Sequence, residues 1–128
     1  MKAGIIGTGK VGSALALALN REGICLAGLY NRSGGPVETL NRRLERDLGN
    51  DLLSVVEGSE LVFITTPDSQ VANAAEAAAA VAGARSLKGK VFIHCSGALP
   101  SSVLEPLGRK GADIGSLHPI QTFTDRED

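Results

Sequence analysis

Apolar residues fall along the chain in short runs that alternate with segments of helical periodicity. Five runs have the length and composition of β-strands, and they cover residues 2–7, 24–30, 61–66, 91–95 and 112–117. Between the first two runs, apolar residues recur at the spacing of one helix face: Val11, Ala14, Leu15, Ala18 and Leu19. The pattern therefore predicts strands that alternate with helices.

Further helices are predicted from charge and composition. A charged helix is expected at residues 37–48, and an alanine-rich helix that packs closely on the sheet is expected from residue 72. Ser102 and Glu105 have the spacing of a capping box, which predicts the start of a short helix. The stretch DLLSVV at residues 51–56 fits either a short strand or part of a helix.

The run LVFITT at residues 61–66 is nearly all apolar, as a strand covered by helices on both faces should be. Alternation of strands and helices along the whole chain implies a doubly wound, mainly parallel sheet with right-handed crossovers. A chain of 128 residues is long enough for one domain and too short for two of ordinary size. We therefore predict one α/β domain with three layers, helix, sheet and helix.

Composition and charge exclude several classes of partner. The chain has 13 basic and 14 acidic side chains, so its net charge of -1 and lack of a basic cluster speak against nucleic acid. No apolar run approaches the ~20 residues that span a bilayer, and we find no signal peptide or membrane anchor. Cys25 and Cys95 lie in apolar runs without metal-binding spacing, so we expect reduced, buried thiols in a cytoplasmic protein and no metal.

The stretch GIIGTGKVGSALA, residues 4–16, can be read in two ways. Read from Gly4, it begins a triphosphate-binding loop, which requires a hydroxyl directly after its lysine to hold magnesium. Val11 occupies that position, so this reading fails. Read from Gly7, it gives G-x-G-x-x-G between a strand and a helix, the pattern of a dinucleotide-binding turn.

In a dinucleotide site, Gly7 would form the tight turn, Gly9 would admit a diphosphate, and Gly12 would let the helix pack against the strand. The amides at the helix start and the positive end of the helix dipole would face the diphosphate. We therefore predict cofactor contacts along the whole loop, at Gly7, Thr8, Gly9, Lys10, Val11 and Gly12.

The end of residues 24–30 should hold Asp or Glu if the 2′-hydroxyl of NAD is to be bound. The sequence has Asn31, Arg32 and Ser33 there. The planar arginine fork suits a 2′-phosphate, and the other two residues supply neutral donors beside it. The expected cofactor is therefore NADP rather than NAD, although a solvent-exposed turn arginine is also compatible with this pattern.

Ligands of parallel sheets lie over the carboxyl ends of the strands. Thr65 and Thr66 end the run at 61–66, where they are placed to contact ribose or nicotinamide. We include Pro67 among the expected cofactor contacts, although Pro67 and Asp68 would equally serve to end the strand and cap the next helix.

Two further strand ends carry candidate chemistry. His94 and Cys95 are neighbours in a strand and point to opposite faces, so we do not expect a nucleophile-and-base pair. Ser96 and Gly97 are expected near the nicotinamide, where glycine gives room for the backbone to approach. His118 is a candidate catalytic residue that donates a proton or hydrogen bond to a substrate carbonyl or imine, and a structural role for it stays open.

Five stretches together resemble the Rossmann-like N-terminal domain of a family of NADP oxidoreductases without an assigned substrate: GIIGTGKVGSALA, YNRS, LVFITTPD, HCSGALPSSVLEPL and GSLHPIQTF. That family is related to pyrroline-5-carboxylate reductase and other members of the 6-phosphogluconate dehydrogenase-like superfamily. The resemblance covers the whole chain, residues 1–128, and its last two stretches are the more specific. It implies that an all-helical C-terminal domain normally follows, forms a homodimer and closes the substrate pocket.

These features predict the NADP-binding domain of an oxidoreductase, a reductase or dehydrogenase that moves a hydride between NADP(H) and a small carbonyl, imine or hydroxy substrate. Two alternatives stay open. One is a non-catalytic module that senses NAD(P) and acts through a partner. The other is a methyltransferase, which usually needs an acidic residue where this chain has Asn31 and Arg32.

Overall fold

Five parallel strands form one sheet in the order β2-β1-β3-β4-β5 in the computed structural model, which describes residues 1–117. The strands are β1 (Lys2–Ile6), β2 (Cys25–Tyr30), β3 (Leu61–Ile64), β4 (Val91–His94) and β5 (Asp113–Ser116). The order reverses at β1, because the chain continues to β2 on one side and then returns to β3 on the other. The predicted doubly wound, parallel sheet is confirmed.

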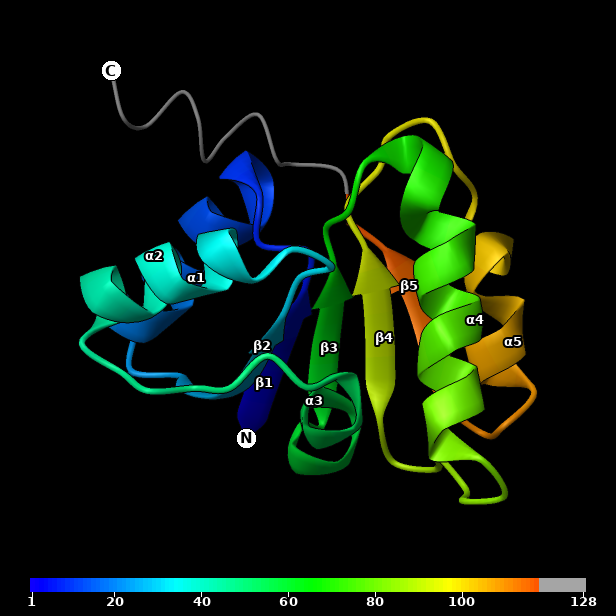
Figure 1. Ribbon diagram of the computed structural model, residues 1–128. Helices are drawn as coiled ribbons and strands as arrows, with labels where there is room; N and C mark the ends of the chain where they lie inside the picture. Colours follow the sequence, from blue (N-terminus) through cyan, green and yellow to red (C-terminus); the bar gives the residue numbers. More distant parts are fainter. Residues whose placement is uncertain (118–128) are drawn as a thin grey trace.

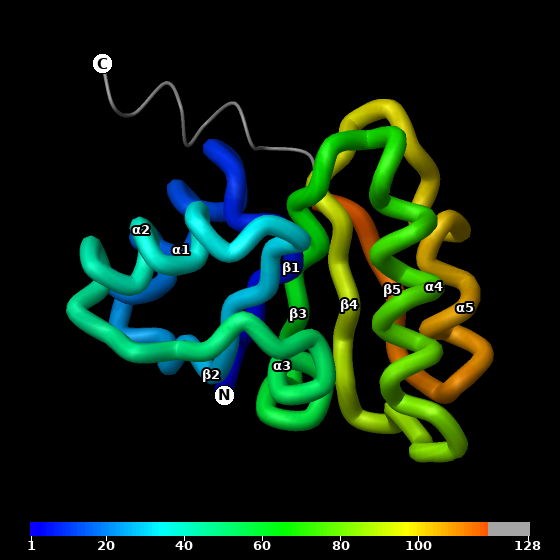
Figure 2. The backbone as a smooth tube through the Cα atoms, viewed as in Figure 1, coloured from blue at the N-terminus to red at the C-terminus, as the bar shows by residue number. Residues whose placement is uncertain are grey.

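Helices cover the two faces of the sheet in separate groups (Figures 1 and 2). The helices are α1 (Lys10–Arg21), α2 (Gly34–Leu44), α3 (Leu52–Gly58), α4 (Val71–Ala82) and α5 (Glu105–Gly108), with short 3-10 turns η1 (Asp68–Gln70) and η2 (Ser101–Leu104). One apolar cluster joins α1 and α2 to the sheet, and a second joins α3, α4 and α5 to the opposite face. The three predicted layers are therefore present.

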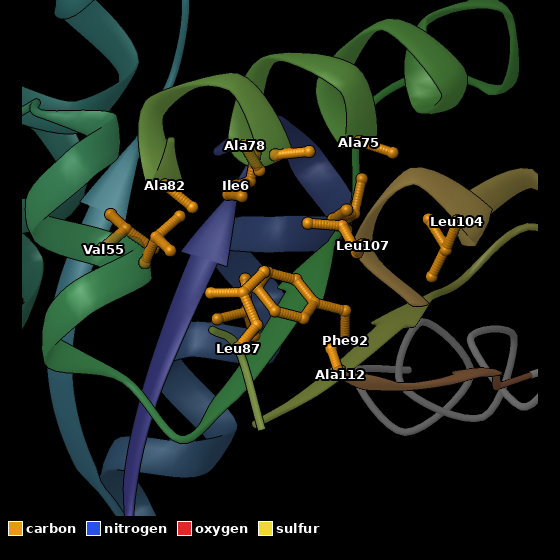
Figure 3. Packing of buried hydrophobic residues seen from close by; sticks show 14 of the residues in the cluster. Ile6, Val55, Ala75, Ala78, Ala82, Leu87, Phe92, Leu104, Leu107 and Ala112 are labelled. Atoms are coloured by element: carbon orange, nitrogen blue, oxygen red, sulfur yellow. The ribbon is translucent and has the colours of Figure 1, made fainter. Parts of the chain in front are cut away.

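Neighbouring residues of β1, β3 and β4 point to opposite clusters, as a sheet buried on both faces requires. Ile5 and Phe63 belong to the cluster under α1 and α2, whereas Ile6 and Phe92 belong to the cluster under α4. Figure 3 shows that α4 meets this second cluster through small side chains, among them Ala75 and Ala78, which are fully buried. The expected close packing of the alanine-rich helix is confirmed.

The ambiguous stretch at residues 51–56 is helical. Oδ2 of Asp51 accepts hydrogen bonds from the amide and hydroxyl of Ser54, at 3.1 and 2.7 Å, and so caps the start of α3. Val55 packs against the backbone of β1 and β2, because a Cβ at Gly4 would lie 2.7 Å from its Cγ1 and one at Gly28 only 3.0 Å from its Cγ2. Glycine in both strands therefore lets this short helix lie close to the sheet.

Several predicted boundaries differ from those observed. Helix α2 starts at Gly34 and ends at Leu44, earlier at both ends than the predicted 37–48. It ends at Leu44 because Glu45 adopts a left-handed conformation with φ of 56°. The predicted capping box is wrong, because Ser102 lies inside η2 and α5 begins only at Glu105. Strand β3 ends at Ile64, so the two threonines after it lie in a loop.

The cysteines are free thiols, but the expectation that both are buried is wrong. Cys25 is exposed because it is the first residue of the edge strand β2. Cys95 follows β4 directly and is half-buried. None of the helices within residues 1–117 combines the length and apolarity needed to cross a membrane.

Candidate functional site

A cavity of about 1100 Å³ lies at the carboxyl edge of the sheet. The strands end in register there, since Ile6 pairs with Tyr30 and Ile64, and Ile64 pairs with His94. The loops after four strands therefore meet at the point where the strand order reverses, the usual ligand position in such sheets. Eleven of the predicted cofactor contacts line the cavity: Gly7, Gly9, Lys10, Val11, Asn31, Arg32, Ser33, Thr65, Thr66, Pro67 and Ser96.

Gly7 forms the tight turn after β1. Its φ of +101° disfavours any side chain, and a Cβ there would lie 2.7 Å from the amide nitrogen of Thr66. The Gly7 amide donates a hydrogen bond of 2.7 Å to the carbonyl of Tyr30, which fixes the turn to β2. The backbone of the loop is therefore held from both neighbouring strands.

The other two glycines of the fingerprint have different environments. A Cβ at Gly12 would lie 1.9 Å from the carbonyl oxygen of Gly7, so helix α1 packs against the turn only because this side chain is missing. A Cβ at Gly9 would meet no atom of residues 1–117 within 4 Å, and Gly9 lines the cavity. Packing of α1 therefore requires glycine at position 12. At position 9 no packing contact requires glycine, but the missing side chain leaves the helix start open to the cavity.

The start of α1 presents unused donors to this open side. Gly9 precedes the helix without a capping side chain, and within residues 1–117 the amides of Lys10 and Val11 donate no hydrogen bond. Such amides, together with the positive end of the helix dipole, form an anion-binding position. Lys10 is exposed at the cavity and adds a positive charge.

Thr8 supports the loop and does not line the cavity. It is 2% exposed, its amide donates to Oδ1 of Asn31 at 3.0 Å, and its carbonyl accepts from the hydroxyl of Ser13 at 2.9 Å. The direct cofactor contacts expected of Thr8 and Gly12 therefore have no counterpart in the cavity wall, because both residues face inward.

The loop between β2 and α2 presents Arg32 and Ser33 to the same cavity, and both are exposed. The one ion pair within residues 1–117 joins Arg85 to Glu57, so no described carboxylate neutralises Arg32. Asn31 also lines the cavity, but its side chain is engaged: Oδ1 accepts from Thr8, and Nδ2 donates to the carbonyl of Ser33 at 3.1 Å.

The two threonines after β3 differ in their bonding. Thr65 Oγ1 donates to the carbonyl of Gly7 at 2.6 Å, so this side chain supports the glycine turn. Thr66 Oγ1 is buried and has no hydrogen-bond partner among the described residues, and Thr66 lines the cavity. A buried hydroxyl without a partner is costly, so Thr66 is the better candidate for bonding to a ligand.

His94, at the end of β4, is a structural histidine. It is fully buried, its Nδ1 accepts from the amide of Ser96 at 3.1 Å, and its Nε2 lies 3.0 Å from the carbonyl of Pro100. Because Nδ1 accepts a bond, the proton of the neutral ring lies on Nε2 and is donated to Pro100. Both nitrogens are used within the loop, which supports the absence of a pair with Cys95.

Ser96 is 7% exposed and lines the cavity, and its hydroxyl accepts a hydrogen bond from the amide of Ala98 at 3.2 Å. Gly97 is exposed but lies outside the cavity wall. Cys95 is a wall residue that the sequence reasoning missed, and burial raises the pKa of its thiol to about 11. His118 lies outside the described residues.

Other wall residues were also missed. An apolar patch between the β2 end and α4 is formed by Tyr30, Leu52, Ala74 and Ala77. The two alanines come from a low-complexity helix, and no sequence signal separates them from the buried alanines beside them. Among the charged wall residues, Lys10 and Arg32 outnumber Asp68, which favours an anionic ligand.

Comparisons with known proteins agree with this architecture. Residues 1–119 match the model of a family described as Rossmann-like domain. An imine reductase from Bacillus cereus is 22% identical with a TM-score of 0.69, over 88% of this chain and 38% of its own. Synechocystis arogenate dehydrogenase is also 22% identical, with a TM-score of 0.69 over 86% of this chain and 37% of its own.

A reductive aminase from Aspergillus terreus, in complex with NADPH and ethyl-5-oxohexanoate, is 24% identical with a TM-score of 0.68, over 87% of this chain and 38% of its own. Comparison with curated proteins gave no match. The chain therefore spans less than two fifths of the length of these solved structures. At these identities the likeness establishes the fold.

Proposed function

Since the chain belongs to the family of Rossmann-like domains, we propose that it is the NADP-binding domain of an oxidoreductase. The reaction is a hydride transfer between NADP(H) and a small carbonyl, imine or hydroxy substrate. One observation carries the proposal: the open helix start beside Gly9 and the guanidinium of Arg32, which forms no ion pair within residues 1–117, face a single cavity large enough for a dinucleotide.

Each part of the cofactor has a corresponding region in the cavity. Gly9 and the amides of Lys10 and Val11 would hold the diphosphate, and a side chain at position 9 would block its approach. Arg32 and Ser33 would hold the 2′-phosphate through charge-assisted and neutral hydrogen bonds. The absence of an acidic residue directly after β2 favours NADP over NAD.

The remaining groups follow the cavity wall. The apolar patch of Tyr30, Leu52, Ala74 and Ala77 would hold the adenine ring, and Thr66 and Ser96 would hold the nicotinamide end. The nicotinamide supplies the hydride when bound, and the protein orients it. The solved imine reductase and reductive aminase structures, of which the latter contains NADPH, support this assignment by their shared fold.

Substrate chemistry requires more than the described residues. We assign His118 as the donor of a proton or hydrogen bond to the substrate, and a helical C-terminal domain as the dimerisation and pocket-closing unit. In a protein that carries such a domain, His118→Ala should reduce turnover while leaving the Kd for NADPH nearly unchanged. Unaltered turnover would return His118 to a structural role.

The direct test is calorimetric titration of residues 1–128 with NADPH, NADH and ATP. We expect NADPH to bind more tightly than NADH and ATP to give no response. Preferred binding of ATP would contradict the dinucleotide assignment of the glycine loop. Binding of NADPH without turnover of any carbonyl or imine, in a protein that carries the helical domain, would favour a cofactor-sensing module instead.

A further inference from the structure

We infer that Asn50 is a positioning residue that holds the two phosphate-binding loops in a fixed relation and thereby favours NADP over NAD. This inference rests on the proposed function. Asn50 lies outside the glycine loop and outside the turn that contains Arg32, in the connection between α2 and α3. That connection returns beside β2 (Figure 2). Asn50 forms a parallel bridge there with Leu29.

The side chain of Asn50 anchors the loop that presents Arg32. Its Oδ1 accepts a hydrogen bond of 2.8 Å from the backbone amide of Asn31. Asn31 is the first residue after β2 and directly precedes Arg32. The bond therefore holds the backbone where the chain leaves β2, directly before the residue whose guanidinium faces the cavity.

Asn31 in turn connects this loop to the glycine loop. Its Oδ1 accepts from the amide of Thr8 at 3.0 Å, and its Nδ2 donates to the carbonyl of Ser33 at 3.1 Å and lies 3.5 Å from the Ser33 hydroxyl. The side chain of one residue thus bonds to both loops, and the backbone of that residue is held by Asn50. The diphosphate and 2′-phosphate positions are linked through these contacts.

Asn50 does not line the cavity, so it acts through Asn31 rather than by touching the cofactor. NADPH carries anionic groups that must meet both loops at once, whereas NADH lacks the 2′-phosphate and depends mainly on the glycine loop. A loop held in its binding conformation before the ligand arrives loses less freedom on binding. Loss of the Asn50 contact should therefore weaken the binding of NADPH more than the binding of NADH.

The test compares the Kd values of wild type, Asn50→Ala and a control, Asn41→Ala, for both cofactors. Asn41 belongs to α2, and its side chain bonds to the carbonyl and amide of Leu48 at 2.6 and 3.0 Å. Unlike Asn50, its side chain makes no hydrogen bond within residues 1–117 to the loop that presents Arg32 or to the glycine loop. Asn50→Ala should raise the Kd for NADPH about three- to tenfold, the effect of one hydrogen bond, and the Kd for NADH less than about twofold. Asn41→Ala should leave the ratio of the two Kd values unchanged.

Amide hydrogen exchange in the cofactor-free protein gives a second readout. Exchange at the Asn31 amide should become faster in Asn50→Ala and stay slow in Asn50→Asp, which keeps the acceptor oxygen. Should Asn50→Ala fail to fold, Asn50→Ser repeats both measurements, because its shorter side chain cannot span the same distance.

Two results would overturn the inference while leaving the proposed function intact. One is an unchanged ratio of the Kd values for NADPH and NADH in a folded Asn50 variant. The other is hydrogen exchange at the Asn31 amide that is equally slow with and without the Asn50 acceptor. Failure of the wild-type protein to bind either cofactor would overturn the proposed function, and the inference with it.

Discussion

A methyl group added at Gly12 should lower stability, whereas one added at Gly9 should weaken cofactor binding, although both residues belong to one loop. In Gly12→Ala the new Cβ would lie 1.9 Å from the Gly7 carbonyl oxygen and 2.6 Å from Thr65 Oγ1. Gly7 cannot retreat, since its amide is bonded to Tyr30 at 2.7 Å and its far side packs on the backbone of Thr66. Helix α1 must therefore shift, and we expect the free energy of unfolding to fall by about 1–3 kcal/mol.

Gly9→Ala places its methyl group in open space, and the φ of -72° at Gly9 is compatible with alanine. The free energy of unfolding should change by less than about 0.5 kcal/mol. The methyl group would nevertheless occupy the approach to the helix start. Loss of even one charge-assisted hydrogen bond to the diphosphate, about 1.5–3 kcal/mol, should raise the Kd for NADPH at least about tenfold.

Urea unfolding followed by circular dichroism measures the first effect, and calorimetric titration with NADPH measures the second. Gly115→Ala is the matched control, because a Cβ there also meets no atom of the described residues within 4 Å and Gly115 lies in β5, outside the cavity wall. Wild-type NADPH affinity in Gly9→Ala would refute the proposed path of the diphosphate. Wild-type stability in Gly12→Ala would refute the packing argument.

Three further changes test separate parts of the account. Arg32→Ala should weaken the binding free energy of NADPH by about 1–3 kcal/mol and barely alter that of NADH. Equal losses of binding free energy for both cofactors in calorimetry would refute the 2′-phosphate assignment. Asp51→Ala should lower the free energy of unfolding by about 0.5–2 kcal/mol through loss of the α3 cap, whereas Asp51→Ser should retain most of it in urea unfolding. Burial raises the Cys95 pKa from 9.0 to about 11, so the folded protein holds this proton more tightly than the unfolded chain. Stability should therefore fall as pH rises from 9 toward 11, less so in Cys95→Ala, and a pH series of urea unfolding curves that is the same for both proteins would contradict this.

Much of the fold could be predicted because its signals are local. The glycine fingerprint follows from close contacts within one turn, and the alternation of strands and helices follows from hydrophobic period. The α3 helix was ambiguous because seven residues, Leu52–Gly58, are too few to establish a period, and its position depends on Gly4 and Gly28 in other strands. The secondary structure of such a segment depends on tertiary contacts, which a local sequence pattern does not contain.

The candidate site was predictable to the extent that strand ends identify it. Strand ends do not reveal whether a given side chain bonds to the cofactor or supports a loop. Asn31 and Thr65 were expected as cofactor contacts, yet their side chains bond to Thr8 and Gly7 and so support the glycine loop. Asn50 carries no motif, and its proximity to Asn31 arises only when the α2–α3 connection folds beside β2.

We propose that one dinucleotide spans the glycine loop and the Arg32 loop of this cavity. Amide-resolved NMR titration of residues 1–128 with NADPH and with NADH tests it most directly. We predict that both cofactors shift the amides of Gly9, Lys10 and Val11, and that NADPH alone strongly shifts those of Arg32 and Ser33. Shifts that fall outside these two loops, or equal shifts of Arg32 with both cofactors, would contradict the account.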